Sequence, residues 1–142
     1  DSCYFAFSFG PFLGFWTAFE AAAQRGCHCI PGGGLGSEQR LRAILDHDVE
    51  YLFCTPTYAL RLIEVARERG IALTSSTVKK IIVAGEPGGS LSGMRETIVS
   101  HWFLQGFRIK KNMMFFLILL EMHEFPRFLS KYRISHNPPF DV

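Results

Sequence analysis

Short runs of apolar residues alternate, over the first hundred positions, with longer segments in which apolar residues recur every three or four positions. The short runs are typical of buried strands and the longer segments of amphipathic helices. Ser37 is expected to cap the second helix, and Thr55 followed by Pro56 to open the third. The expected strands are Cys3–Ser8, Cys27–Pro31, Tyr51–Cys54, Val78–Ala84 and Phe107–Ile109; the expected helices are 12–23, 37–45, 55–69 and a last one that begins at Ser90 or Ser92 and ends at Trp102.

Strands that alternate with single helices predict an α/β fold with a mostly parallel sheet. Parallel neighbours need right-handed crossover connections, and these place helices on both faces of the sheet. In such folds, ligands bind beyond the carboxyl ends of the strands. Four loops are expected at that edge, and all four are rich in glycine, proline or threonine: 9–12, 31–34, 55–57 and 85–89. These residue types let the backbone approach a ligand closely, so the edge is the expected site.

Glu86 is the carboxylate that this site would hold. It follows a strand of apolar residues and Gly85, and precedes Pro87 and Gly88. A carboxylate that is partly removed from water needs a partner, which could be a backbone donor, a ligand amine or a bound cation. The alternative is an ordinary solvated loop acid.

Two other motifs invite a ligand and favour a plainer interpretation. The glycine run Gly32–Gly36 lacks the Lys-Ser/Thr ending of a P-loop and the dinucleotide spacing, which favours a flexible turn. Cys27 and Cys29 face one side of a strand and His28 the other, so the three cannot converge on one metal ion. Buried free thiols are expected there, and no metal ligand is assigned.

Composition narrows the classes of partner. A formal net charge of +2 over 142 residues indicates neither a nucleic-acid partner nor a membrane surface. The four cysteines lie in apolar runs without the spacing of a secreted framework, which favours a reducing, cytoplasmic setting. The chain opens at Asp1 without a basic leader or an initiating methionine, which suggests a fragment.

Three motifs in register carry a family resemblance. They are the segments 7–12, 54–60 and 84–90, with the sequences Phe-Ser-Phe-Gly-Pro-Phe, Cys-Thr-Pro-Thr-Tyr-Ala-Leu and Ala-Gly-Glu-Pro-Gly-Gly-Ser. Together they resemble the phenylacetate–CoA ligase group of the adenylate-forming, AMP-binding enzymes. The resemblance covers residues 1–109 and implies part of the large N-terminal domain of such an enzyme.

The resemblance implies a two-step ligase reaction. ATP and a carboxylic acid, aromatic or otherwise apolar, would give an acyl-adenylate and pyrophosphate, and coenzyme A would then displace AMP to form a thioester. The cofactors of the full-length enzyme would be ATP, Mg²⁺ and coenzyme A. The residues that match the family motifs would line the adenine site (Gly85, Glu86, Pro87, Gly88), the acyl pocket (Phe7, Phe9, Phe12) and the wall beside that pocket (Thr55, Pro56). Phe7, Phe9 and Phe12 are, alternatively, simple core residues.

The chain departs from the family at both ends. The phosphate loop would precede residue 1, and Lys110–Met114 stands where the family has a segment ending in Gly-x-Thr-Glu, whose Glu helps to hold magnesium. The small domain with the catalytic lysine is missing. No residue is therefore assigned a catalytic role, and the fragment alone is expected to be inactive.

The composition changes after residue 109, where a divergent tail begins. Residues 103–142 hold six basic residues against three acidic ones and only one of the 13 glycines. A reading-frame slip or a mis-joined gene model fits this break, and 110–142 is expected to pack poorly, with a helix over Met113–Met122. The apolar run Met113–Leu120 is too short for the about 20 residues of a membrane span. Two alternatives to the ligase stay open: a non-catalytic interaction domain that binds through this tail, and an unrelated nucleotide-binding enzyme that uses the glycine run.

Overall fold

The computed structural model describes residues 1–8, 10, 13–86, 91–103 and 113–115. In chain order the elements are β1 (Ser2–Phe5), α1 (Leu13–Gln24), β2 (His28–Pro31), α2 (Ser37–Asp46), β3 (Tyr51–Cys54), α3 (Pro56–Glu68), a 3₁₀ turn η1 (Leu73–Ser75), β4 (Lys80–Val83), α4 (Ser92–Trp102) and β5 (Met113–Phe115). The first four strands and all four helices fall where the apolar pattern predicts them.

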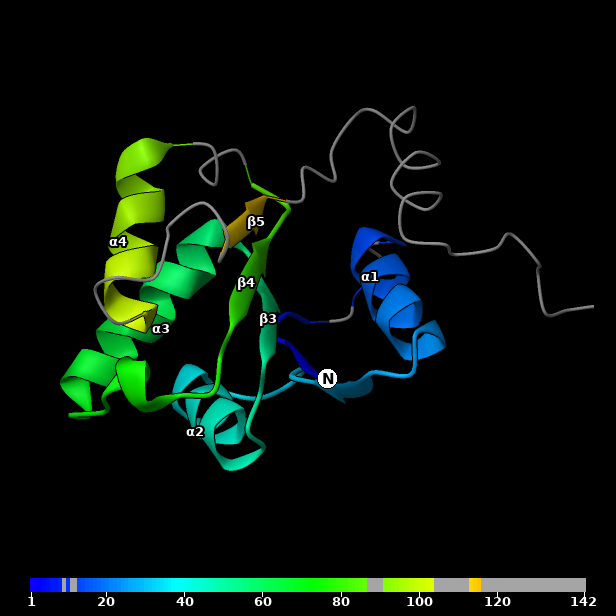
Figure 1. Ribbon diagram of the computed structural model, residues 1–142, viewed down its shortest axis with the longest axis horizontal. Helices are drawn as coiled ribbons and strands as arrows, with labels where there is room; N and C mark the ends of the chain where they lie inside the picture. The colour runs from blue at the N-terminus through cyan, green and yellow to red at the C-terminus, as the bar shows by residue number, and fades with distance from the viewer. Residues whose placement is uncertain (9, 11–12, 87–90, 104–112, 116–142) are drawn as a thin grey trace, which may run out of the picture.

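The strands form one sheet in the order β2-β1-β3-β4-β5, and every neighbouring pair is parallel. Figure 1 shows α1 on one side of this sheet and α2, α3 and α4 on the other. The predicted α/β class with a parallel sheet is therefore confirmed. Because all strands run in the same direction, the loops that follow β1, β2, β3 and β4 leave the same edge.

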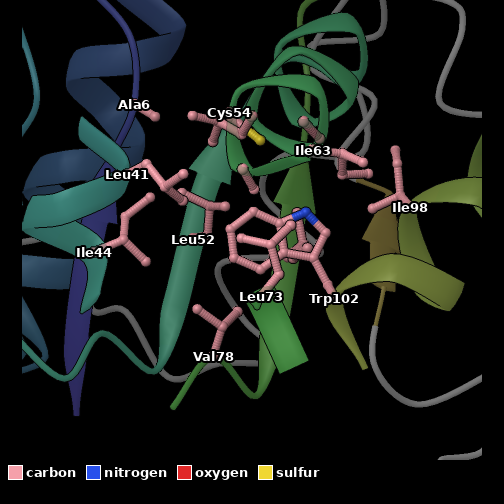
Figure 2. Packing of buried hydrophobic residues seen from close by; sticks show 14 of the residues in the cluster. Ala6, Leu41, Ile44, Leu52, Cys54, Ile63, Leu73, Val78, Ile98 and Trp102 are labelled. Atoms are coloured by element: carbon pink, nitrogen blue, oxygen red, sulfur yellow. The ribbon is translucent and has the colours of Figure 1, made fainter. Parts of the chain in front are cut away.

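The sheet separates two apolar clusters of unequal size. Alternate residues of β1 point to opposite faces, so Tyr4 joins the cluster beneath α2–α4 and Phe5 joins the one beneath α1. The larger cluster is centred on Leu52 and Trp102, both almost completely buried (Figure 2). It contains most of the buried apolar residues among those that the structure describes and packs α3 and α4 against β3 and β4.

Helix ends follow local sequence chemistry with one correction. Thr55 caps α3 as predicted: its Oγ1 accepts from the Tyr58 N–H at 3.2 Å, and Pro56 occupies the first helical position. For α2 the capping position is Gly36, and the expected cap Ser37 is the first helical residue. The Gln39 side chain accepts from the Gly36 N–H at 2.9 Å, which satisfies the backbone donor of the capping residue.

The tail departs from the expectation of a helix over 113–122. Met113–Phe115 instead pairs with β4 in parallel, with Ile82 opposite Met114. The open edge of β4 offers unpaired backbone groups, and a strand satisfies them where a helix could not. The strand expected at 107–109 and the rest of the tail lie outside the described residues, so the expected poor packing of 110–142 stays a prediction. Within the described part of the chain, no helix is both long and apolar enough to cross a membrane.

Candidate functional site at the carboxyl edge of the sheet

The loops after β3 and β4 meet at the carboxyl edge, as the parallel topology predicts. Glu86, just after β4, contacts Thr57 in the first turn of α3. Gly85 lies beside the same turn, since a β-carbon built on it would be 3.6 Å from Thr55 Cγ2. The two segments are about 30 residues apart in sequence and form one surface in the fold.

The Glu86 carboxylate is held by the N-terminus of α3. Thr57 donates its backbone N–H to Oε2 at 3.2 Å, and its hydroxyl lies 2.9 Å from Oε1 and 2.7 Å from Oε2. The first backbone N–H groups of a helix have no partner within the helix, and the helix dipole makes this end positive. A half-buried carboxylate is stabilised there. Of the partners considered from the sequence, the backbone donor is the one observed.

The thiol of Cys54 also interacts with the charge of Glu86. It ends β3, is 2% exposed, and lies directly before the cap Thr55. Burial raises the pKa of the Cys54 thiol, and the negative charge of Glu86 raises it further. With its pKa raised in this way, the thiol stays protonated at neutral pH.

Gly85 opens the loop in a conformation that favours glycine, with φ +90°. A side chain there would be strained and would point toward Thr55 and Phe15, whose Cζ would be 3.7 Å from the added β-carbon. Without it, the backbone of Gly85 is exposed. A flat ligand ring could lie against this backbone.

An aromatic stack borders the loop. Phe7 lies after β1, is 8% exposed, and stacks on Phe15 of α1 with ring centroids 4.1 Å apart. Phe15, which the sequence did not single out as a site residue, is the ring that faces Gly85. The only hint in the sequence was its place on the apolar stripe of α1, and that stripe equally predicts core.

The other predicted site residues divide into two groups. Thr55 is half-buried and caps α3, and Pro56 is buried beneath it. Phe9, Phe12, Pro87 and Gly88 lie outside the described residues.

The glycines after β2 have structural roles. A β-carbon on Gly32 would lie 2.8 Å from Tyr4 Oη and 2.9 Å from the Phe5 carbonyl oxygen. Gly34 has φ +75° and lets the chain turn toward α2. Close packing and a left-handed turn therefore explain these two glycines, in line with the turn interpretation.

The thiols Cys3, Cys27 and Cys29 are free, but Cys27 and Cys29 are half-buried rather than buried as expected. Cys3 is buried and lies opposite Cys29 in the β1–β2 register. Burial and the neighbouring Cys27 raise the pKa of Cys3 to about 12. Among the residues that the structure describes, no three His, Cys, Asp or Glu side chains are grouped so that they could hold a metal ion.

A cavity of about 650 Å³ opens at the opposite edge. It is lined by residues at the amino ends of the strands, among them His28, Glu50 and Lys79. Glu50 pairs with Lys79 across it and accepts from the Ser2 N–H at 3.3 Å. This cavity lies across the sheet from Glu86 and shares no residue with the predicted site.

Comparison with known proteins points to one enzyme group. The chain is 28% identical over 87 residues to a phenylacetate–coenzyme A ligase of Aromatoleum evansii, covering 61% of this chain and 20% of that protein. It is 29% identical over 82 residues to one of Thermus thermophilus, covering 58% and 18%. A solved structure of 2-hydroxyisobutyryl-CoA ligase in complex with 2-HIB-AMP and CoA matches with a TM-score of 0.68 and 27% identity, over 72% of this chain and 23% of that one.

No family model matches the chain. The chain spans about a fifth of the length of the curated relatives it matches. Over that part, the resemblance to acyl-CoA ligases of the adenylate-forming family is confirmed by both sequence and fold.

Proposed function

We propose that this chain forms part of the large domain of an ATP-dependent acyl-CoA ligase that adenylates an aromatic or other apolar carboxylic acid. The observation that carries the proposal is the Glu86–Thr57 contact, which joins two motif loops at the edge where such sheets bind ligands. The solved relative of similar fold contains 2-HIB-AMP and CoA. Free thiols and the absence of a secreted framework favour action in the cytoplasm.

In this proposal the carboxyl edge binds and orients the acyl-adenylate. Gly85, Glu86, Pro87 and Gly88 would lie along the adenine, which slides against the backbone of the loop. Phe7, Phe9 and Phe12 would line the acyl pocket, with Thr55 and Pro56 supporting its wall. Apolar rings beside the acyl group would favour apolar acids over charged ones.

The proposed reaction has two steps. The acid carboxylate attacks the α-phosphorus of ATP, forming an acyl-adenylate and releasing pyrophosphate. The thiol of coenzyme A then attacks the acyl carbon, forming the thioester and releasing AMP. The resemblance also implies Mg²⁺ with the ATP, but no group of described residues fits this ion, so we assign none of them to it. The chain would supply binding surface rather than catalytic groups.

Acid-dependent exchange of pyrophosphate into ATP tests the proposal. Adenylation is reversible, so the full-length protein should exchange labelled pyrophosphate into ATP when an aromatic or other apolar acid is present, and not in its absence. The 142-residue chain alone should show no turnover. Thioester formation by this chain alone, or no exchange by the full-length protein with any apolar acid, would refute the proposal.

The tail boundary belongs to the same proposal. We propose that residues 1–109 derive from the ligase domain and that the tail 110–142 arises from a reading-frame slip or a mis-joined gene model. Sequencing the genomic DNA tests this: a Gly-x-Thr-Glu segment encoded in another frame just downstream is the expected result. A continuous native frame with the same tail in related genes would overturn it.

A further inference from the structure

Arg40 is the one charged residue that is buried among those the structure describes, with 7% of its surface exposed. It lies in the first turns of α2, next to the exposed Arg42, which pairs with Glu38 at 2.9 Å. The Arg40 guanidinium instead donates to two backbone carbonyls. Nε donates to the Gly32 oxygen at 2.7 Å, and Nη1 donates to the Ala6 oxygen at 3.2 Å.

These two carbonyls belong to the first residues after two adjacent strands. Ala6 follows β1 and donates its N–H to the Phe53 oxygen at 2.8 Å, while Gly32 follows β2 and donates to the Phe5 oxygen at 2.9 Å. Arg40 therefore satisfies backbone acceptors at the point where strand pairing ends. Its planar fork of donors can hold both carbonyls at once, which a lysine ammonium holds less rigidly.

A third element joins the same group. The Arg40 Cζ lies 5.1 Å from the ring centroid of Tyr58, in the first turn of α3. The Tyr58 hydroxyl donates to Ser37 Oγ at 3.1 Å, and its backbone N–H donates to Thr55 Oγ1. Arg40 thus contacts the ends of β1 and β2 and the helix turn that holds Glu86.

A buried guanidinium without a carboxylate partner is not the most stabilising choice at such a position. Removing its charge from water is costly, and a well-packed apolar side chain of similar volume is often at least as stable. Its specific effect is geometric, because one rigid group bonds two backbone segments and also contacts the Tyr58 ring of α3. Ala6 directly precedes Phe7, the first predicted residue of the acyl pocket.

We propose that Arg40 is a positioning residue that fixes the carboxyl ends of β1 and β2 and thereby the acyl side of the ligand site. The fixed position of the strand ends rests on the contacts of Arg40 with Ala6, Gly32 and Tyr58. The effect on binding of the acid rests on the proposed function. Loss of the fork should loosen Ala6 and Gly32 while the far end of α3 stays intact.

Amide hydrogen exchange in the 142-residue chain tests whether Arg40 fixes the strand ends. Arg40→Met should accelerate exchange at the Ala6 and Gly32 amides by about tenfold or more relative to the Ile71 amide, which bonds Ala66 far from Arg40. Arg40→Lys should accelerate the same two amides and covers the case in which Arg40→Met does not fold. Arg42→Met is the matched control on the same helix and should leave all three amides unchanged. Uniform acceleration including Ile71, or wild-type protection in Arg40→Lys, would overturn the proposal.

Pyrophosphate exchange by the full-length protein tests the effect on the acid. Arg40→Lys should raise the KM for the acid by about tenfold and change the KM for ATP by less than about twofold. Equal changes in both KM values would overturn the assignment to the acyl side. If the wild-type protein shows no acid-dependent exchange, the proposed function fails, while the hydrogen-exchange result still decides whether Arg40 fixes the strand ends.

Discussion

Among single residues, Glu86 shows how a carboxylate that follows an apolar strand can still find hydrogen-bond donors. Its carboxylate lies at the N-terminus of α3 and takes up two donors of Thr57. Helix N-termini stabilise negative charge through their free N–H groups and their dipole. The same contact joins the segment after β4 to the first turn of α3.

Glu86→Ala should lower the free energy of unfolding by about 0.5–2 kcal/mol, because it removes the acceptor for the Thr57 N–H and hydroxyl. Urea denaturation of the chain measures this. Glu64→Ala, which removes an exposed carboxylate paired with Arg61 on the same helix, should cost at most about 0.5 kcal/mol. The double variant with Thr57→Val should be clearly less destabilised than the sum of the single variants, and strict additivity would contradict the contact.

Stability should fall as the pH rises above about 9, in part because of Cys3. In the unfolded chain this thiol ionises near its ordinary value of 9.0, while burial raises the pKa in the folded chain to about 12. Between these values the unfolded state loses the proton first, so folding weakens by up to about 1.4 kcal/mol per pH unit from this group. Between pH 8 and about pH 10.5, the urea midpoint measured under reducing conditions should drop further in the wild type than in Cys3→Ala. Equal drops in the two proteins would contradict this account.

At the scale of elements, close packing decides where glycine is needed. Gly32 lies against Tyr4 and the backbone of Phe5, whereas Gly93, in the first turn of α4, has nothing within 4 Å of an added β-carbon. At Gly32 there is no space for a side chain, and the neighbouring backbone of Phe5 cannot move aside easily.

Gly32→Ala should therefore destabilise the chain by about 1–3 kcal/mol, since its methyl group overpacks the end of β1. Gly93→Ala is the matched control and should be neutral or stabilise by up to about 1 kcal/mol, because alanine favours the helix. Thermal or urea unfolding of both variants measures the difference. A Gly32→Ala variant as stable as Gly93→Ala would show that the end of β1 yields readily.

Element positions could be predicted because their signals are local. The spacing of apolar residues located four strands, and Thr55-Pro56 located the start of α3, since a cap and its helix are neighbours in sequence. The strand at Met113–Phe115 could not be predicted, because it depends on the open edge of β4, about 30 residues earlier. The cap of α2 was predicted at Ser37 but lies at Gly36, whose N–H donates to the Gln39 side chain.

The candidate site was predictable to the level of loops. The alternation of strands and helices predicts Thr55 and Glu86 on one edge, and the contact of Glu86 with Thr57 confirms it. The contacts of Thr57, Phe15 and Arg40 depend on side-chain directions across different elements, and no sequence spacing records these. Phe9, Phe12, Pro87 and Gly88 remain predictions.

At the scale of the whole molecule, the sheet has two chemically distinct edges. The carboxyl edge carries Glu86, the aromatic stack and the Arg40 group, and the amino edge carries the cavity around Glu50 and Lys79. The similarity to acyl-CoA ligases covers about a fifth of those proteins. We propose that the carboxyl edge binds the acyl-adenylate.

Binding of a hydrolysis-resistant acyl-adenylate analogue to the full-length protein tests whether the carboxyl edge has this role. Isothermal titration calorimetry would compare the Kd of the wild type with those of Glu86→Ala at the carboxyl edge and Glu50→Ala at the amino edge. The predicted result is that Glu86→Ala weakens binding by about 1–3 kcal/mol, or about 5- to 150-fold, while Glu50→Ala changes the Kd by less than about twofold. Unchanged affinity in Glu86→Ala, or an equal loss in both variants, would contradict the claim.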